Sequence, residues 1–381
     1  MLRNGGTAVR RHTSQRQRGS GDGDGFGVAY PSSWSLPLTI GVELLAGFLS
    51  ELISDEELDG YRRGDDRATA ALGAYVRGIR ATMAVGLPPI VGTKVERVSA
   101  GECPAVWLTP PRLATGRTVM WMHGGAFILC NTATHARLLS SLGAAADARV
   151  LSVEYPLSPD EGDYGDMLAQ VTAAYRWLTD PAGGGVVPED VIVGGDSAGG
   201  HLALGLVHAL RDDPVARQPA GVVLMSPWLD PGREHPRTSE SWSSAEESTD
   251  YLRGVEHVLG FVSEVVFGCG AGGGGGRGEK TQLPRNLLRR ELWENADLPP
   301  VLVQYGGAEV LAGEARVFGE VAKAVAWNVE LEEWEGMPHV FQVFDSVAPE
   351  GASAINSAAA FISRAAAAAS KTAAPSPSPR G

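Results

Sequence analysis

The chain has 381 residues, of which 44% are hydrophobic and 20% are charged, so it is long and apolar enough to bury a sizeable core. Its 32 basic and 45 acidic residues give a net charge of −13, which argues against nucleic acid or an anionic membrane surface as a partner. Three cysteines without a CxxC pair predict neither a disulfide framework nor a structural zinc site. No run of 18 apolar residues occurs, so no transmembrane segment is predicted.

Both ends of the chain have the composition of disordered tails. Residues 1–30 are rich in Gly, Arg and Ser, and residues 371–381 end in alternating Pro and Ser. The first 20 residues hold five arginines and no acid, a pattern that is also compatible with a mitochondrial transit peptide. The apolar segment of a secretory signal is missing, and we expect a cytoplasmic protein.

Between the tails, the pattern predicts one α/β domain over residues 31–370. The domain begins with helices, because apolar residues from Leu38 to Leu52 recur at three- and four-residue spacing. Short β-rich runs follow at 94–98, 105–109, 118–122 and 149–154. Helices and strands then alternate over 167–178, 191–194, 198–210 and 221–226. This alternation predicts a mostly parallel sheet with helices on both faces.

Residues 231–298 interrupt the alternation. They contain a predicted helix near 251–266 and a glycine-rich segment, 268–280. Glycine has a large ordering entropy and no side chain to bury, so a flexible loop is predicted there. The alternation resumes at 301–305, 315–326, 329–334 and 353–369.

The segment Gly195-Asp196-Ser197-Ala198-Gly199 has the pattern GxSxG. An apolar strand precedes it and a helical run follows, which is the context of a nucleophile elbow. The flanking glycines relieve crowding in a tight turn, and the start of a helix favours negative charge. Ser197 is therefore the predicted nucleophile.

The segment His123-Gly124-Gly125-Ala126 follows another apolar strand. Glycines allow backbone N–H groups to turn toward a neighbouring oxyanion. Together with the N–H of Ala198, this segment is a candidate oxyanion hole. Among the four candidate donors, Gly125 and Ala198 are favoured over Gly124 and Ala126.

A general base and its orienting carboxylate are predicted after two later strands. His339 follows the strand that ends at Trp334, and Glu309 is the first acid after the strand at 301–305. The chain order Ser197, Glu309, His339 is the order of an α/β-hydrolase triad. Glu314 is the alternative carboxylate, and its position at the start of a helix also has a simple electrostatic explanation.

Together these motifs resemble the hormone-sensitive-lipase-like family of α/β-hydrolase carboxylesterases. The matching segments are 123–127, 153–160, 195–203, 226–230 and 336–341, and the resemblance covers about residues 36–365. It implies an α/β-hydrolase core under a helical cap made of residues 34–86 and 231–298. It also implies hydrolysis of small-molecule esters with short to medium acyl chains, with no cofactor and no metal.

The chain departs from the family pattern at two site positions. Ala126 stands where the family has the third glycine of HGGG, and Glu309 stands where the family usually has aspartate. An alanine keeps the backbone N–H, but a positive φ there would cost up to about 1–2 kcal/mol. Either acid can orient a histidine, so these changes bear on rate and specificity more than on reaction type.

Two other functions share the same residues. One is a ligand receptor that keeps the fold with little or no turnover, and the other is a deacetylase or amidase that uses the same triad. Related receptors typically replace the catalytic histidine, so the presence of His339 favours an enzyme. No oligomeric state is predicted.

Overall fold

The structure is a computed structural model. It describes residues 8–12, 34–36, 38–43, 73–74, 76–81, 86–213, 215–238, 249–253, 255–267 and 285–373. The predicted glycine-rich loop at 268–280 lies outside the described residues. Among the described helices, none has the length and apolar character needed to cross a membrane.

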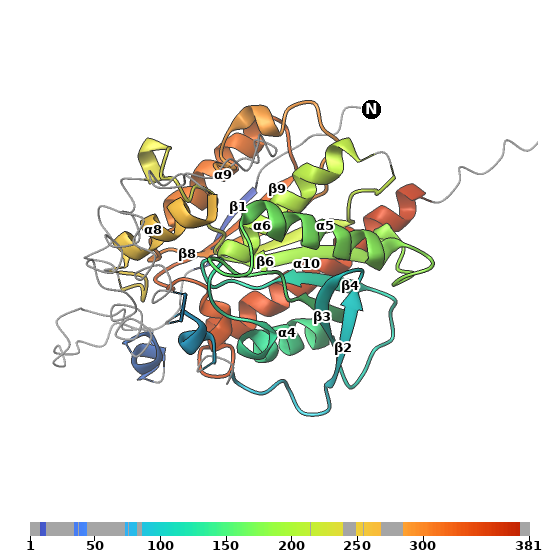
Figure 1. The fold of residues 1–381 in the computed structure, drawn as a ribbon, viewed down its shortest axis with the longest axis horizontal. Coiled ribbons are helices and arrows are strands. Elements are labelled where there is room, and N and C mark those ends of the chain that lie inside the picture. The colour runs from blue at the N-terminus through green and yellow to red at the C-terminus, as the bar shows by residue number, and fades with distance from the viewer. Residues whose placement is uncertain are drawn as a thin grey trace, which may run out of the picture.

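The described strands form one nine-stranded sheet in the order β1-β9-β8-β7-β6-β4-β5-β3-β2 (Figure 1). The strands are β1 (Ala8–His12), β2 (Lys94–Ala100), β3 (Cys103–Thr109), β4 (Thr118–Met122), β5 (Arg149–Val153), β6 (Val191–Asp196), β7 (Gly221–Met225), β8 (Val301–Gly306) and β9 (Val329–Trp334). Only the β2–β3 and β3–β5 pairs are antiparallel. The prediction of a mostly parallel sheet is confirmed.

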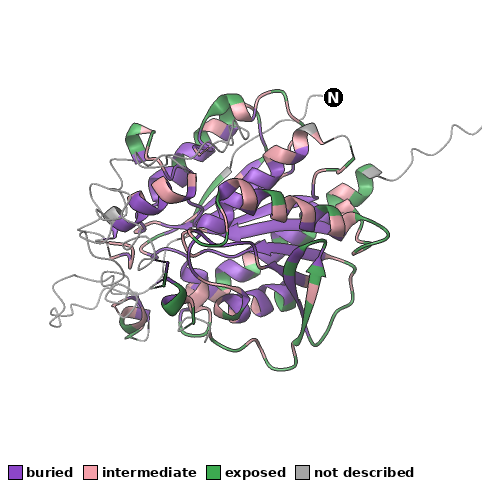
Figure 2. Ribbon diagram, viewed as in Figure 1, coloured by how far each residue is buried: buried purple, intermediate pink, exposed green. Residues whose placement is uncertain are grey.

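Helices cover both faces of the sheet. They are α4 (Thr132–Ala146), α5 (Tyr164–Thr179), α6 (Ala198–Ala209), α8 (Glu256–Phe267), α9 (Ala312–Ala324) and α10 (Pro349–Ala373). The apolar residues of α4 and α10 form one core cluster with the sheet, and those of α5, α6, α8 and α9 form the other. The two cores enclose the buried central strands (Figure 2).

The central strands are continuous apolar runs because both of their faces are covered. Every residue of β4, β6, β7 and β8 is buried. Burial of each Val, Leu or Ile side chain contributes about 1.5–3 kcal/mol, so these strands form a rigid platform. The loops that leave their carboxyl ends are therefore held in defined positions.

Two ends of the domain differ from the sequence prediction. The predicted disordered tail 1–30 is corrected at Ala8–His12, which forms β1 and pairs in parallel with β9. The ring of His12 stacks on Trp334 with centroids 4.2 Å apart. The predicted tail 371–381 is corrected at its start, because α10 continues to Ala373.

Helix α4, in the middle of the chain, is absent from the sequence prediction, because small residues and a histidine break up its apolar pattern.

The N-terminal helical residues lie against the loop that carries His339. Trp34, Leu38 and Val42 form a separate apolar cluster with residues of that loop, including Met337. The indole N–H of Trp34 also donates to the carbonyl of Gly336 at 2.8 Å. Residues of the predicted cap therefore contact the candidate active site.

Candidate active site

Four neighbouring parallel strands bring the predicted catalytic residues to one edge of the sheet. These strands are β6, β7, β8 and β9, and the carboxyl ends of parallel strands meet at the same edge. Ser197 follows β6 directly, Glu309 follows β8, and His339 follows β9. The sheet therefore gathers residues that are far apart in the sequence.

Ser197 occupies the tight turn between β6 and α6. Its backbone has φ 52° and ψ −121°, a conformation that is rare for a residue with a side chain. Such backbone strain costs about 1–3 kcal/mol and occurs most often at functional sites. Its N–H donates to the carbonyl of Met225 at 2.9 Å, which fixes the turn to β7. Ser197 is half-buried between two fully buried neighbours, as in a nucleophile elbow.

The two glycines that flank Ser197 leave no room for a side chain. A Cβ atom on Gly195 would lie 2.3 Å from the carbonyl oxygen of Gly199. A Cβ atom on Gly199 would lie 2.0 Å from the carbonyl oxygen of Met122. Both separations are far inside van der Waals contact, so the packing of the turn requires glycine at each position.

Glu309 and His339 form a buried pair. Nδ1 of His339 lies 3.9 Å from Oε1 of Glu309, a separation longer than a hydrogen bond. Within the described part of the chain, neither of these two atoms has a hydrogen-bond partner. Catalytic hydrogen bonds are often long in the absence of substrate and tighten when it binds. The arrangement is therefore that of a carboxylate placed to orient an imidazole.

Burial and mutual attraction set the pKa values of this pair. Burial raises the pKa of the Glu309 carboxyl, and its contact with His339 offsets only part of that effect. Burial also lowers the pKa of His339, but the attraction of Glu309, supported by Asp250 and Asp196, raises the His339 pKa above its ordinary value. The surrounding carboxylates therefore favour the imidazolium that a general base forms.

Ser226, directly after β7, links the loops of the acid and the base. Its hydroxyl donates to Oε2 of Glu309 at 2.6 Å and accepts from the N–H of Val340 at 2.9 Å. The N–H of Gly306 donates to the same carboxylate oxygen at 2.9 Å. Two donors thus fix one oxygen of Glu309, and its other oxygen faces His339.

The acid and base loops also approach each other closely at Gly306. A Cβ atom on Gly306 would lie 2.1 Å from the carbonyl oxygen of Met337. The N–H of Ala308 donates to that same carbonyl at 3.2 Å. Glycine at the end of β8 therefore allows the backbone contact that brings Glu309 beside His339.

Glu314 has a different environment. Its carboxylate accepts hydrogen bonds from the N–H groups of Leu229 and Asp230, the second at 2.9 Å, and the side chain is fully buried. Glu314 therefore holds the loop after β7 and lies in the first turn of α9. This geometry favours Glu309 over Glu314 as the partner of His339.

Asp196, next to the nucleophile, holds the predicted oxyanion loop. Its carboxylate accepts from the N–H of Gly124 at 3.0 Å and from the indole of Trp121 at 2.9 Å. This bond occupies the N–H of Gly124, so the prediction of Gly124 as an oxyanion donor is corrected. A Cβ atom on Gly124 would lie 2.3 Å from the Asp196 carboxylate, which explains the need for glycine.

Gly125, Ala126 and Ala198 are the remaining candidate donors. Gly125 has φ 111°, and a Cβ atom there would lie 2.3 Å from the carbonyl oxygen of Leu129. Ala126 has φ 52°, the strained conformation considered from the sequence. The N–H groups of these three residues donate no hydrogen bond to other described residues, and that of Ala198 opens a helix. They are therefore available to an oxyanion.

His123 contacts the backbone of the candidate oxyanion loop. Its ring is buried and stacks on Tyr155, with centroids 4.5 Å apart. Its Nδ1 donates to the carbonyl of Gly124 at 2.7 Å. Burial lowers the pKa of His123 to about 4, so the ring is neutral at neutral pH. His123 therefore acts on loop conformation rather than as a base.

Three residues of the site were not singled out from the sequence. His135 on α4 donates from Nε2 to Asp196 at 3.0 Å, although its sequence context suggested no role. Ser226 begins the segment 226–230, which entered only as part of the family resemblance. Asp250 lies in the inserted segment and accepts from the backbone of His339 at 3.1 Å. A polar residue at the end of a predicted apolar strand was the one usable signal, and it applied only to Ser226.

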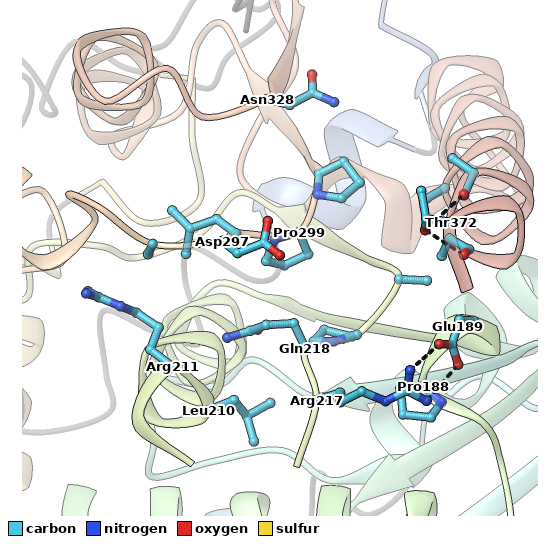
Figure 3. Close-up of a pocket in the computed structure, with 18 of the residues that line it drawn as sticks. Pro188, Glu189, Leu210, Arg211, Arg217, Gln218, Asp297, Pro299, Asn328 and Thr372 are labelled. Carbon is cyan, nitrogen blue, oxygen red and sulfur yellow. Dashed lines mark hydrogen bonds and ion pairs between the residues drawn. The ribbon is translucent and has the colours of Figure 1, made fainter. Parts of the chain in front are cut away.

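A hollow of about 860 Å³ lies at the opposite edge of the sheet (Figure 3). Some of its lining residues come just before strands: Glu189 precedes β6, Gln218 precedes β7, Pro299 precedes β8 and Asn328 precedes β9. The predicted catalytic residues follow three of these strands, β6, β8 and β9. This hollow is therefore separate from the candidate active site.

Comparisons with known proteins identify the fold and the family. A family model described as an alpha/beta hydrolase fold matches residues 119–343. The chain is 33% identical over 293 residues to an acetyl-hydrolase of Streptomyces hygroscopicus, a match covering 76% of this chain and 87% of that protein. It is 30% identical over 251 residues to the carboxylesterase/phospholipase LipF of Mycobacterium tuberculosis, covering 65% and 62% of the two chains.

The fold is also similar to that of solved esterases. One is an esterase from the bacterial hormone-sensitive lipase family, with a TM-score of 0.68 at 27% identity, covering 87% of this chain and 99% of that one. The sequence motifs, the sheet and these matches agree, and the chain therefore belongs to the hormone-sensitive-lipase-like family of α/β-hydrolase carboxylesterases.

Proposed function

We propose that this chain is a serine carboxylesterase in which Ser197, His339 and Glu309 form the catalytic triad. The observation that carries the proposal is the convergence of three loops at one sheet edge, with a strained Ser197 and a buried Glu309–His339 pair. His339 removes the proton of the Ser197 hydroxyl while its oxygen attacks the ester carbonyl. Glu309 orients the imidazole and stabilises the imidazolium that forms.

The negative charge on the carbonyl oxygen is stabilised by backbone N–H groups. Gly125 and Ala198 are the principal donors in this proposal, and Ala126 is a third candidate. The positive end of α6 lies at Ala198 and adds to the stabilisation. Removal of one such donor typically costs about 10²–10³ in kcat, so the fixed shape of this loop matters.

The acyl-enzyme is then hydrolysed by the same groups. The imidazolium of His339 returns its proton to the leaving alcohol as the carbon–oxygen bond breaks, leaving an ester on Ser197. Water attacks this ester while His339 accepts its proton. Collapse of the second tetrahedral intermediate releases the carboxylic acid and restores the Ser197 hydroxyl.

The proposed substrates are esters with acyl chains of about two to eight carbons, because the cap predicted from the sequence would enclose an acyl pocket of limited volume. The relatives support ester hydrolysis, since one is named an acetyl-hydrolase and another a carboxylesterase/phospholipase, and the first name agrees with a short acyl group. Trp34 and Leu38, apolar residues of the predicted cap, pack against the loop that carries His339, which supports an apolar acyl site. Acetyl and butyryl esters are therefore the first substrates to test.

Hydrolysis of p-nitrophenyl acetate, butyrate, octanoate and palmitate tests the proposal directly. Wild-type protein should cleave the shorter esters faster than the palmitate, and a fluorophosphonate probe should label Ser197. Ser197→Ala should lose labelling and about 10⁶-fold in kcat. Ser353→Ala, which removes an exposed hydroxyl on α10, is the control and should retain both properties.

The alternative functions are separated by the same experiment. A folded wild-type protein that neither cleaves the esters nor reacts with the probe would be a receptor. A protein that takes the probe but cleaves only p-nitroanilide amides would be an amidase. Faster cleavage of palmitate than of butyrate would overturn the proposed chain-length preference while leaving the triad in place.

A further inference from the structure

Asp250 is a buried carboxylate that joins the loops of the acid and the base. Its Oδ1 accepts from the N–H of His339 at 3.1 Å, and its Oδ2 accepts from the N–H of Val310 at 2.9 Å. Val310 is the residue after Glu309. One side chain with no exposed surface therefore holds the backbone at both members of the buried pair.

Asp250 belongs to the inserted segment, not to the α/β core. Its own carbonyl accepts from Nη1 of Arg253 at 2.9 Å, and Nη2 of Arg253 donates to Glu43 at 2.9 Å. Glu43 lies in the N-terminal helical segment, and both side chains of this ion pair are mostly buried. The ring of Tyr251 lies edge-on to the ring of His339, with centroids 5.8 Å apart. Both predicted cap segments thus reach the triad through residues 250–253.

We propose that Asp250 is a positioning residue that sets the distance and orientation between Glu309 and His339 and couples the cap segments to the triad. This inference rests on the proposed esterase function. The 3.9 Å gap between Nδ1 of His339 and Oε1 of Glu309 has to shorten during catalysis. Asp250 limits how the two backbones move while that happens. Ser226, in the core, restrains the side chain of Glu309. Asp250, in the predicted cap, restrains the backbone at Val310 and His339.

The carboxylates around His339 make the pH dependence of kcat/KM a test of the role of Asp250. Glu309, Asp250 and Asp196 all raise the pKa of His339, and burial opposes them. Removing the charge of Asp250 should therefore lower the His339 pKa. Because the base acts only when neutral, the acid limb of kcat/KM should move to lower pH. A merely structural role would leave that limb in place.

Asp250→Asn is the principal variant, made in the full-length protein. The amide can accept one of the two hydrogen bonds, but its NH₂ group then faces a backbone N–H. With p-nitrophenyl butyrate, kcat should fall by about 10- to 100-fold through misplacement of the pair, with KM changed less than about threefold. The acid limb of kcat/KM should shift to lower pH.

Asp230→Asn is the matched control. Asp230 is equally buried and accepts from two backbone N–H groups, those of Glu234 and His235, at 3.0 and 2.8 Å. Its variant should keep the wild-type acid limb even where it lowers the melting temperature. Asp250→Glu retains the charge and displaces the carboxylate by about 1 Å, so kcat should fall while the acid limb stays near wild type.

Two results would overturn the inference. One is an Asp250→Asn protein with wild-type kcat and acid limb. The other is a loss of kcat that Asp230→Asn reproduces, with the acid limb unmoved in both. If Asp250→Asn fails to fold, Asp250→Glu decides, and wild-type kcat in that variant contradicts positioning. A wild type that neither cleaves the ester nor takes the fluorophosphonate probe would instead show that the proposed function is wrong.

Discussion

The N–H of Gly124 donates to the carboxylate of Asp196 at 3.0 Å, so the residue before the proposed nucleophile fixes the start of the proposed oxyanion loop. His135 and Trp121 supply two further donors to the same carboxylate. Although burial raises its pKa, these contacts hold the pKa of Asp196 below its ordinary value. The proposed nucleophile and the proposed oxyanion loop are therefore positioned by one buried anion.

Asp196→Asn should impair catalysis more than its effect on stability explains. The amide lacks the negative charge that holds the three donors and can accept at only one of the two oxygen positions, so the oxyanion loop shifts and kcat should fall by about 10²-fold. Trp121→Phe is the control, because it removes a donor to the other carboxylate oxygen and leaves the Gly124 bond in place. Steady-state kinetics on folded protein should show the larger kcat loss in Asp196→Asn, and equal losses would contradict this role.

Gly125→Ala should lose most of its activity. A Cβ atom there meets the carbonyl oxygen of Leu129 at 2.3 Å, and φ is 111°. The loop must move, and loss of a positioned donor should lower kcat by about 10²–10³-fold. Gly185→Ala is the control, because φ is 67° there but the nearest atom to a Cβ would be 3.9 Å away. That variant should show only a small loss of stability, and similar kcat values in the two variants would disprove the assignment.

Glu309→Gln and Glu314→Gln should separate catalysis from stability. Loss of the triad carboxylate leaves His339 without an orienting charge, and kcat should fall by about 10⁴-fold in Glu309→Gln. Glu314→Gln disturbs two hydrogen bonds to backbone N–H groups at Leu229 and Asp230. It should lower the free energy of unfolding by about 1–3 kcal/mol, with kcat within about tenfold of wild type. Denaturant unfolding and kcat are measured on both, and the reverse pattern would make Glu314 the acid.

The rate should fall on acidification as His339 becomes protonated. Its pKa lies above the ordinary value of 6.5 because the attraction of Glu309 outweighs burial. A raised pKa moves protonation to higher pH, so the acid limb of kcat/KM should lie above pH 6.5. In Glu309→Gln the residual activity should show an acid limb at lower pH than wild type. A wild-type acid limb near pH 4 in folded protein would rule out His339 as the base.

The sequence by itself determined the reaction type and the parts of the site that depend on local geometry. Ser197 and its flanking glycines stand out because a tight strand-to-helix turn restricts which residues fit. Gly125 stands out for the same reason, and the alternation of apolar segments determines a mostly parallel sheet. Such signals lie within a few residues of one another, so they can be read along the chain.

Only the tertiary structure decided which distant groups meet. Ser226 contacts Glu309 across 83 sequence positions, and Asp250 contacts His339 across 89. Nothing in the local sequence encodes such contacts, because they depend on how strands are ordered and how loops leave them. The pairing of β1 with β9 and the engagement of the Gly124 N–H by Asp196 have the same origin. In each case a backbone group is satisfied by a partner that only the assembled sheet brings within hydrogen-bond distance.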